Sequence, residues 1–330
     1  MHADLPLDEA RAYRPDLHVP DDLEEFWRAT LDEAPVTCQV ERVDSGLVAV
    51  ESHDVTFTGF GGHPVRAWLH LPAAALRPSS GRLSGVVQLQ GYNGGRGLAH
   101  EHVFWASAGY AHLVVDTRGQ GSGWTTGATG DPGATGPSQP GFLTRGVEDR
   151  DTYYYRRAYA DACRAVAVLR GHEVVDPARV VVAGASQGGA LALAAAALVP
   201  DQVAAVLCDV PFLCDLRRAA GLAQAEPYLE LVRYLAAHRD RVEQTFATLA
   251  HFDGAVLARL ARAPALFSVA MMDVICPPST VFAAYNAYAG DKDIEVYEFN
   301  DHEGGEAFQR SRQLAWLRDV LAARGGPTSG

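Results

Sequence analysis

The chain has 330 residues, of which 48% are hydrophobic and 21% charged, so it holds enough apolar material for a large globular core. Its 28 basic and 40 acidic residues give a formal net charge of −12, which argues against nucleic acids and anionic membranes as partners, because both bind basic surfaces. The only lysine, Lys292, lies in a polar turn. A Walker P-loop is therefore excluded, and Schiff-base chemistry is disfavoured.

The cysteines and the N-terminus predict a cytoplasmic protein. Five cysteines are scattered without the close pairs of zinc or redox motifs, as is typical of free thiols in a reducing compartment. The acidic N-terminus lacks the apolar core of a signal peptide, and the longest apolar run, residues 190–199, is too short for a membrane span. Two His-Glu pairs, at 172–173 and 302–303, lack the second histidine of a zinc motif. We expect no metal and no cofactor.

The first third of the chain predicts an arm, a helix and a hairpin. Residues 1–34 contain an arm and then a helical pattern, which Asp21 and Asp22 are placed to cap. Residues 47–72 alternate with period two on either side of Gly61-Gly62, which predicts an antiparallel hairpin.

Strand and helix patterns then alternate to the C-terminus. Strand candidates are residues 85–90, 111–116, 178–184, 202–209, 263–273 and 293–300. Helix candidates are residues 98–108, 152–171, 189–198 and 309–323. The strand candidates are rich in valine and leucine without strict alternation, as in strands buried on both faces. The sequence therefore predicts an α/β fold whose mostly parallel sheet is covered by helices on both faces.

Two insertions interrupt this alternation. Residues 118–150 are rich in glycine, threonine and proline and have no periodicity, which is typical of functional or mobile loops. Residues 211–262 are helical in pattern and predict a lid or a subunit interface. Neither has the character of a separate domain, so we expect one domain over residues 1–330, with a frayed tail at 325–330.

The segment Gly184-Ala185-Ser186-Gln187-Gly188 matches the GxSxG pattern of a nucleophile elbow. It follows a strand candidate and opens an apolar helix pattern, and this strand–turn–helix context is what exposes a nucleophilic serine. The alternative is a glycine-rich turn in which Ser186 only caps the helix.

A serine nucleophile needs a base and an acid that orients the base, in the chain order serine, acid, histidine. Asp273 ends a later strand candidate and is the favoured acid, with Asp209 as the alternative; Asp116 precedes the serine. His302 is the only histidine after Asp273 and lies in the loop before the last helix, so it is the predicted base. Its alternative is a surface loop histidine.

The oxyanion formed on attack needs preorganised N–H donors. We expect one from the backbone of Gln187, after the serine, and one from the backbone of Tyr92, in the glycine-rich loop after strand candidate 85–90. A second glycine-rich segment, residues 118–123, has Trp124 where a dinucleotide fingerprint needs glycine, so no nucleotide site is predicted.

These features resemble carbohydrate esterase family seven, the acetyl xylan esterases and cephalosporin-C deacetylases of the α/β-hydrolase superfamily. The resemblance covers nearly the whole chain. The segments that carry it are residues 91–96, 118–121, 144–146, 151–157, 184–189, 209–214, 272–273, 276–280 and 302–303. It implies Ser186, Asp273 and His302 as the triad and Tyr92 and Gln187 as oxyanion donors. It also implies acetyl specificity and a homohexamer whose active sites face an inner cavity.

Three positions are interpreted through the same resemblance. Arg118 is expected to brace the active-site loops. Gln90 stands where the family would have histidine, and Gly123 where it would have serine. We expect these two departures to affect rate and acyl preference, not the reaction class.

The resulting hypothesis is a serine esterase that removes acetyl groups from carbohydrates and cephalosporin-type compounds. Two alternatives stay open: a peptidase or larger-acyl esterase with the same triad, and a non-catalytic oligomeric scaffold.

Overall fold

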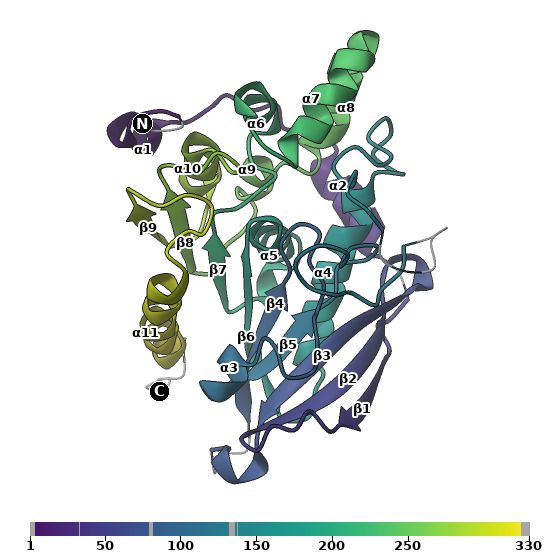
Figure 1. Ribbon diagram of the computed structural model, residues 1–330, viewed down its shortest axis with the longest axis vertical. Helices are drawn as coiled ribbons and strands as arrows, with labels where there is room; N and C mark the ends of the chain where they lie inside the picture. The colour runs from purple at the N-terminus through teal and green to yellow at the C-terminus, as the bar shows by residue number, and fades with distance from the viewer. Residues whose placement is uncertain (1–3, 33, 79–81, 132–135, 137, 325–330) are drawn as a thin grey trace.

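The computed structural model describes residues 4–32, 34–78, 82–131, 136 and 138–324 (Figure 1). One nine-stranded sheet has the order β1-β2-β3-β5-β4-β6-β7-β8-β9. Its strands are β1 Cys38–Val43, β2 Val50–Thr58, β3 Pro64–Pro72, β4 Leu83–Leu89, β5 Ala111–Val115, β6 Val175–Ala185, β7 Ala205–Asp209, β8 Ala265–Ala270 and β9 Lys292–Tyr297. The helices are α1 Leu7–Ala12, α2 Leu23–Leu31, α3 Phe104–Ser107, α4 Tyr154–Arg170, α5 Gln187–Leu198, α6 Leu216–Leu222, α7 Tyr228–Ala237, α8 Val242–Ala250, α9 Gly254–Leu257, α10 Pro278–Ala287 and α11 Glu306–Arg324.

The strands from β4 to β9 run parallel, and β1, β2 and β3 extend the sheet as an antiparallel meander through the pairing of β3 with β5. The predicted hairpin over residues 47–72 is confirmed as β2 and β3. The edge strand β1 was not predicted, because its side chains are exposed or half-buried and give no clear apolar alternation.

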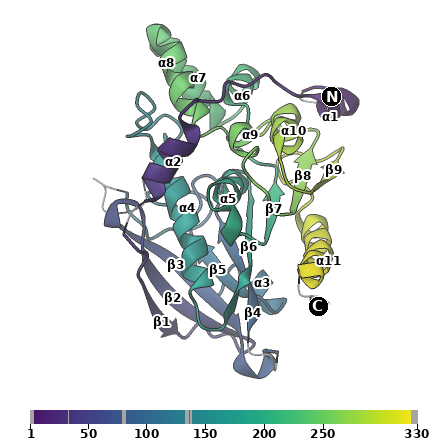
Figure 2. The same ribbon diagram turned by 180° about the vertical axis from the view of Figure 1, so that it is seen from behind.

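Helices cover both faces of the sheet, which confirms the predicted α/β class. Helices α4 and α5 pack on the face seen in Figure 2. The other face packs against α3 and α11 through a smaller cluster that includes Trp105 and Leu317. Strand β4 contributes to the cores on both faces of the sheet, because Val87 belongs to the larger cluster and its neighbour Val86 belongs to the smaller one.

Several predicted boundaries were wrong. The helix expected over residues 98–108 is reduced to α3, Phe104–Ser107, because the backbone has positive φ at Gly97 and at His102, where a right-handed helix cannot pass. The strand expected over residues 263–273 ends at Ala270, so Asp273 lies in the turn beyond it. Asp22 precedes α2, but its carboxylate does not cap the helix and instead pairs with Arg150 at 2.7 Å.

The insertion over residues 211–262 is helical as predicted, and contains α6, α7, α8 and α9. Helices α7 and α8 project together from the top of the molecule in both views (Figures 1 and 2). Within the described ranges, no helix has both the length and the apolar character to span a membrane. The expected frayed tail at 325–330 lies outside the described residues.

A buried ion pair joins the irregular 118–150 segment to α4. Arg118 is 1% exposed, and its guanidinium donates to both carboxylate oxygens of Asp161, at 2.5 and 2.7 Å. Asp131 lies 3.5 Å from the same guanidinium. These contacts give Arg118 the bracing position expected from the sequence, because it fixes the start of this segment against a core helix.

We predict that Arg118→Ala destabilises the fold by about 3–5 kcal/mol, because it leaves the buried Asp161 carboxylate without its cation. Urea unfolding followed by tryptophan fluorescence measures the loss. Arg233→Ala is the matched control: it removes an exposed ion pair with Glu226 and is expected to cost less than about 1 kcal/mol. Equal losses in the two variants would contradict the prediction.

Candidate active site

Ser186 occupies the sharp turn between β6 and α5, as the GxSxG motif predicts. Its φ of 56° and ψ of −122° lie in a region that residues other than glycine rarely adopt. A Cβ atom at Gly184 would lie 2.3 Å from the Gly188 backbone, so the turn needs glycine there. The Ser186 hydroxyl makes no capping hydrogen bond with the helix, which disfavours the alternative of a simple capping serine.

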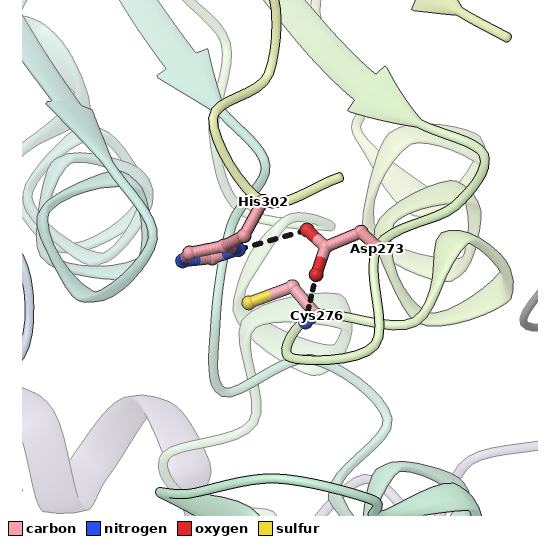
Figure 3. Close-up of side chains that lie close together, drawn as sticks. All are labelled: Asp273, Cys276 and His302. Carbon is pink, nitrogen blue, oxygen red and sulfur yellow. Dashed lines mark hydrogen bonds and ion pairs between the residues drawn. The ribbon is translucent and has the colours of Figure 1, made fainter. Parts of the chain in front are cut away.

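Asp273 and His302 form a hydrogen-bonded pair (Figure 3). His302 Nδ1 lies 2.8 Å from Asp273 Oδ2, and an ionised carboxylate only accepts, so Nδ1 carries the proton. The other oxygen of the fully buried Asp273 accepts the backbone N–H groups of Ile275 and Cys276, each at 2.8 Å. The carboxylate is thus fixed on both sides and directs the second ring nitrogen of His302 away from itself.

Cys276 links this pair to the serine. Its Sγ lies 4.0 Å from Ser186 Oγ. The same sulfur atom lies within 4.8 Å of a carboxylate oxygen of Asp273 and of a ring nitrogen of His302. Burial raises the pKa of the Cys276 thiol well above its usual range, which keeps the sulfur protonated beside the serine. The structure therefore pairs Asp273 with His302 and places Ser186 beside their neighbour Cys276. Among the described residues, no hydrogen bond joins Ser186 to His302, so the complete triad stays a prediction.

Asp209, the alternative acid, has other partners. Its carboxylate accepts hydrogen bonds from Ser268 Oγ at 3.0 Å, Gln309 Nε2 at 2.7 Å and Gln313 Nε2 at 2.6 Å. It therefore holds α11 against the sheet, while His302, in the loop before α11, pairs with Asp273. Asp116 likewise accepts backbone N–H groups, including that of Ala128, and is structural.

The two expected oxyanion donors lie on adjacent backbone segments. Gln187 is the first residue of α5, where backbone N–H groups have no intrahelical partner. Within the described residues, the backbone N–H groups of Gln187 and Tyr92 donate to no protein acceptor. Both are thus available to a ligand oxygen, and their role as oxyanion donors stays a prediction.

The Gln187 side chain is buried and fully bonded. Its Oε1 accepts from Tyr155 Oη and from Gln120 Nε2, both at 2.8 Å. Its Nε2 donates to the Gln90 carbonyl oxygen at 3.2 Å. The side chain therefore ties the end of β4, the 118–150 segment and α4 to the nucleophile turn.

The two departures from the family pattern both involve the loop after β4, because Gln90 opens this loop and Gly123 contacts Asn93 within it. Gln90 is 1% exposed, and its Nε2 has no hydrogen-bond partner among the described residues. Gly123 donates its N–H to the Asn93 carbonyl oxygen at 3.1 Å, and a Cβ atom there would lie 2.8 Å from that same oxygen. The serine expected at position 123 would therefore displace the loop that carries Tyr92.

A cavity of about 1330 Å³ opens above the serine. Ser186, His302 and Tyr92 line it, and Trp124, which is 59% exposed, also borders it. One side is formed by α7, so part of the 211–262 insertion borders the site as expected of a lid. The other side follows the sheet face between α3 and α11.

We predict that Asp209 lowers stability at neutral pH. Burial raises its pKa from 3.8 to about 6, so between these values the folded protein binds a proton that the unfolded chain does not. The contribution of this proton to the free energy of unfolding is therefore most favourable below pH 4 and is lost as the pH rises through about 6.

Replacing Asp209 with asparagine removes this titration. The stability of Asp209→Asn relative to wild type should increase by on the order of 2 kcal/mol from pH 4.5 to 7.5. Urea unfolding at both pH values measures the difference. A difference that does not vary with pH would contradict the prediction.

Comparison with known proteins identifies the family of this chain. The acetyl xylan esterase (AXE1) family matches residues 1–320. An acetyl xylan esterase from Paenibacillus sp. R4 is 35% identical, with 96% of this chain and 99% of that chain covered at a TM-score of 0.84. Acetyl xylan esterase 1 from Thermoanaerobacterium sp. JW/SL YS485 is 31% identical, with the same coverage and a TM-score of 0.86.

Among curated proteins, the acetyl esterase Axe7A of Xylanibacter ruminicola is 28% identical over 314 residues. The match covers 91% of this chain and 67% of that relative, so the chain spans about two thirds of its length. The resemblance found in the sequence is thereby confirmed: the chain belongs to the acetyl xylan esterase family of carboxylic ester hydrolases and has its α/β-hydrolase fold.

Proposed function

We propose that this protein is a serine esterase that removes acetyl groups from acetylated carbohydrates through an acyl-enzyme intermediate. The observation that carries the proposal is the Asp273–His302 hydrogen bond beside a serine held in an elbow turn at a cavity. A serine hydroxyl is a weak nucleophile unless a neighbouring base accepts its proton, and His302, held by Asp273, is the base that we propose.

The proposed reaction has two half-reactions. Ser186 Oγ attacks the acetyl carbonyl carbon while His302 Nε2 accepts the serine proton and then donates it to the departing alcohol oxygen. In the second half, His302 takes a proton from water, the resulting hydroxide attacks the acetyl-serine, and acetate leaves as the proton returns to Ser186. Asp273 keeps the imidazole in the productive tautomer and stabilises its cationic form.

The backbone N–H groups of Tyr92 and Gln187 would stabilise the oxyanion in both half-reactions. Neither has a protein acceptor within the described residues, so neither must break a hydrogen bond to act. Such preorganised donors stabilise negative charge where it develops, and removing one typically slows turnover roughly 10²–10³-fold.

The acetyl and carbohydrate specificity is supported by the acetyl xylan esterases that share the fold over nearly their whole length. Trp124 adds a half-exposed aromatic surface at the cavity, of the kind on which sugar rings pack. A cephalosporin with an acetyl side chain presents the same ester on another bulky alcohol, so we include this class in the proposal. No feature of the described residues favours the peptidase or scaffold alternatives.

We predict that wild type releases acetate from both an acetylated xylo-oligosaccharide and 7-aminocephalosporanic acid, and that Ser186→Ala abolishes release from both. The reason is that Ser186 carries the only side-chain hydroxyl of the nucleophile turn, residues 184–188. Coupled acetate assays measure release, and circular dichroism controls for folding. Comparable release by the alanine variant would refute the nucleophile, and no release by wild type would refute the acetyl specificity.

The homohexamer stays a prediction from the family resemblance. Sedimentation equilibrium should give about six times the mass of one chain. A monomer or dimer across the tested concentration range would contradict it.

A further inference from the structure

The Tyr92 side chain connects the oxyanion loop to the helical insertion. Its hydroxyl donates to Glu230 Oε1 at 2.6 Å and accepts the backbone N–H of Phe142 at 3.0 Å. Glu230 lies in the first turn of α7, 138 residues further along the chain. The residue whose backbone N–H is proposed to bind the oxyanion is therefore anchored to α7 through its own ring.

Glu230 accepts hydrogen bonds from three donors. Besides Tyr92, the backbone N–H groups of Gly141 and Leu143 donate to its two oxygens, each at 3.1 Å. Glu230 is partly buried and lines the cavity, and burial raises its pKa from its usual range. One carboxylate thus joins the oxyanion loop, the 118–150 segment and α7.

Two other contacts hold the backbone at Tyr92 and Asn93, and both come from neutral groups. Trp124 Nε1 donates to the Tyr92 carbonyl oxygen at 3.1 Å, and the Asn93 N–H donates to Gln120 Oε1 at 2.6 Å. The Tyr92–Glu230 bond differs from these two, because hydrogen bonds to a carboxylate are shorter and about twice as strong as neutral ones.

We propose that Glu230 is a positioning residue that sets the place of the Tyr92 backbone N–H in the oxyanion hole. The proposal rests on the proposed function, because it assumes that Tyr92 is an oxyanion donor. A displacement of about 1 Å in a reacting geometry can cost roughly 10²-fold in rate. Glu230 therefore acts on turnover without touching the ester.

The test compares four proteins with 4-nitrophenyl acetate: wild type, Glu230→Ala, Glu230→Gln and Tyr92→Phe. Glu230→Ala should lower kcat about 10–100-fold and change KM less than about threefold, because the lost interaction acts in the transition state. Glu230→Gln keeps an acceptor for the tyrosine hydroxyl and should recover part of the loss. Tyr92→Phe keeps the backbone N–H but loses the anchor, and should resemble Glu230→Ala.

The double variant separates this role from general destabilisation. If both side chains act through one bond, Tyr92→Phe with Glu230→Ala should lose no more kcat than the more affected single variant. Glu243→Gln, in the exposed part of the same insertion, is the matched control and should keep wild-type kcat. A kcat of Glu230→Ala within twofold of wild type, or multiplicative losses in the double variant, would overturn the inference.

A fluorophosphonate probe keeps this test independent of the substrate. Its reaction with a nucleophilic serine also develops charge on an oxygen. The probe should therefore label Ser186 at least about 10-fold more slowly in Glu230→Ala than in wild type. If wild type is labelled but releases no acetate, the acetyl specificity fails while the labelling rates still decide the role of Glu230. Equal labelling rates would overturn that role, and an unlabelled wild type would overturn it together with the nucleophile.

Discussion

The site depends on one constraint, the direct backbone contact between the nucleophile turn and the end of β4. A Cβ atom at Gly188 would lie 2.2 Å from the Leu89 carbonyl oxygen, so only glycine allows α5 to begin this close to β4. The loop after β4 leaves at this same point and carries Tyr92. The contact therefore places Ser186 and the two candidate oxyanion donors side by side before any side chain is considered.

A buried polar network holds this backbone arrangement. Gln120 and Gln187 each donate to the other's amide oxygen, at 2.8 and 3.1 Å, and Tyr154 and Tyr155 satisfy further positions. An unpaired buried amide would cost free energy, so a fully bonded network favours one arrangement over its alternatives. The described part of the irregular 118–150 segment, which contributes Gln120, thus helps to hold the site in place.

Local patterns were enough to predict the parallel strands and the nucleophile turn, and they also suggest the candidate triad residues. The GxSxG motif is recognisable because sterics dictate its glycines, and His302 is recognisable because no later histidine competes. The helix predicted at residues 98–108 failed because its apolar spacing is helical but the backbone has a positive φ at His102, which side-chain spacing does not reveal.

The choice between Asp273 and Asp209 shows what sequence patterns leave undecided. Asp209 ends β7 and Asp273 follows β8, so both lie at the carboxyl ends of neighbouring parallel strands. Their environments separate them: two backbone N–H groups fix Asp273 beside His302, whereas two glutamine amides from α11 engage Asp209. Those amides are 100 and 104 residues away from Asp209, so the distinction arises only when α11 packs on the sheet.

Contacts between residues distant in sequence also explain why no single residue of the 211–262 insertion was predicted to border the site. Helical spacing in residues 211–262 predicts helices and says nothing about which side chain reaches the cavity. Glu230 has no motif, and its neighbours in sequence are ordinary helix formers. Its role follows from geometry alone: a carboxylate in the first turn of α7, at the favourable end of the helix dipole, meets a tyrosine hydroxyl and two backbone donors from separate loops. In this fold, the sheet supplies the nucleophile turn, and an inserted helix completes the surroundings of the oxyanion loop.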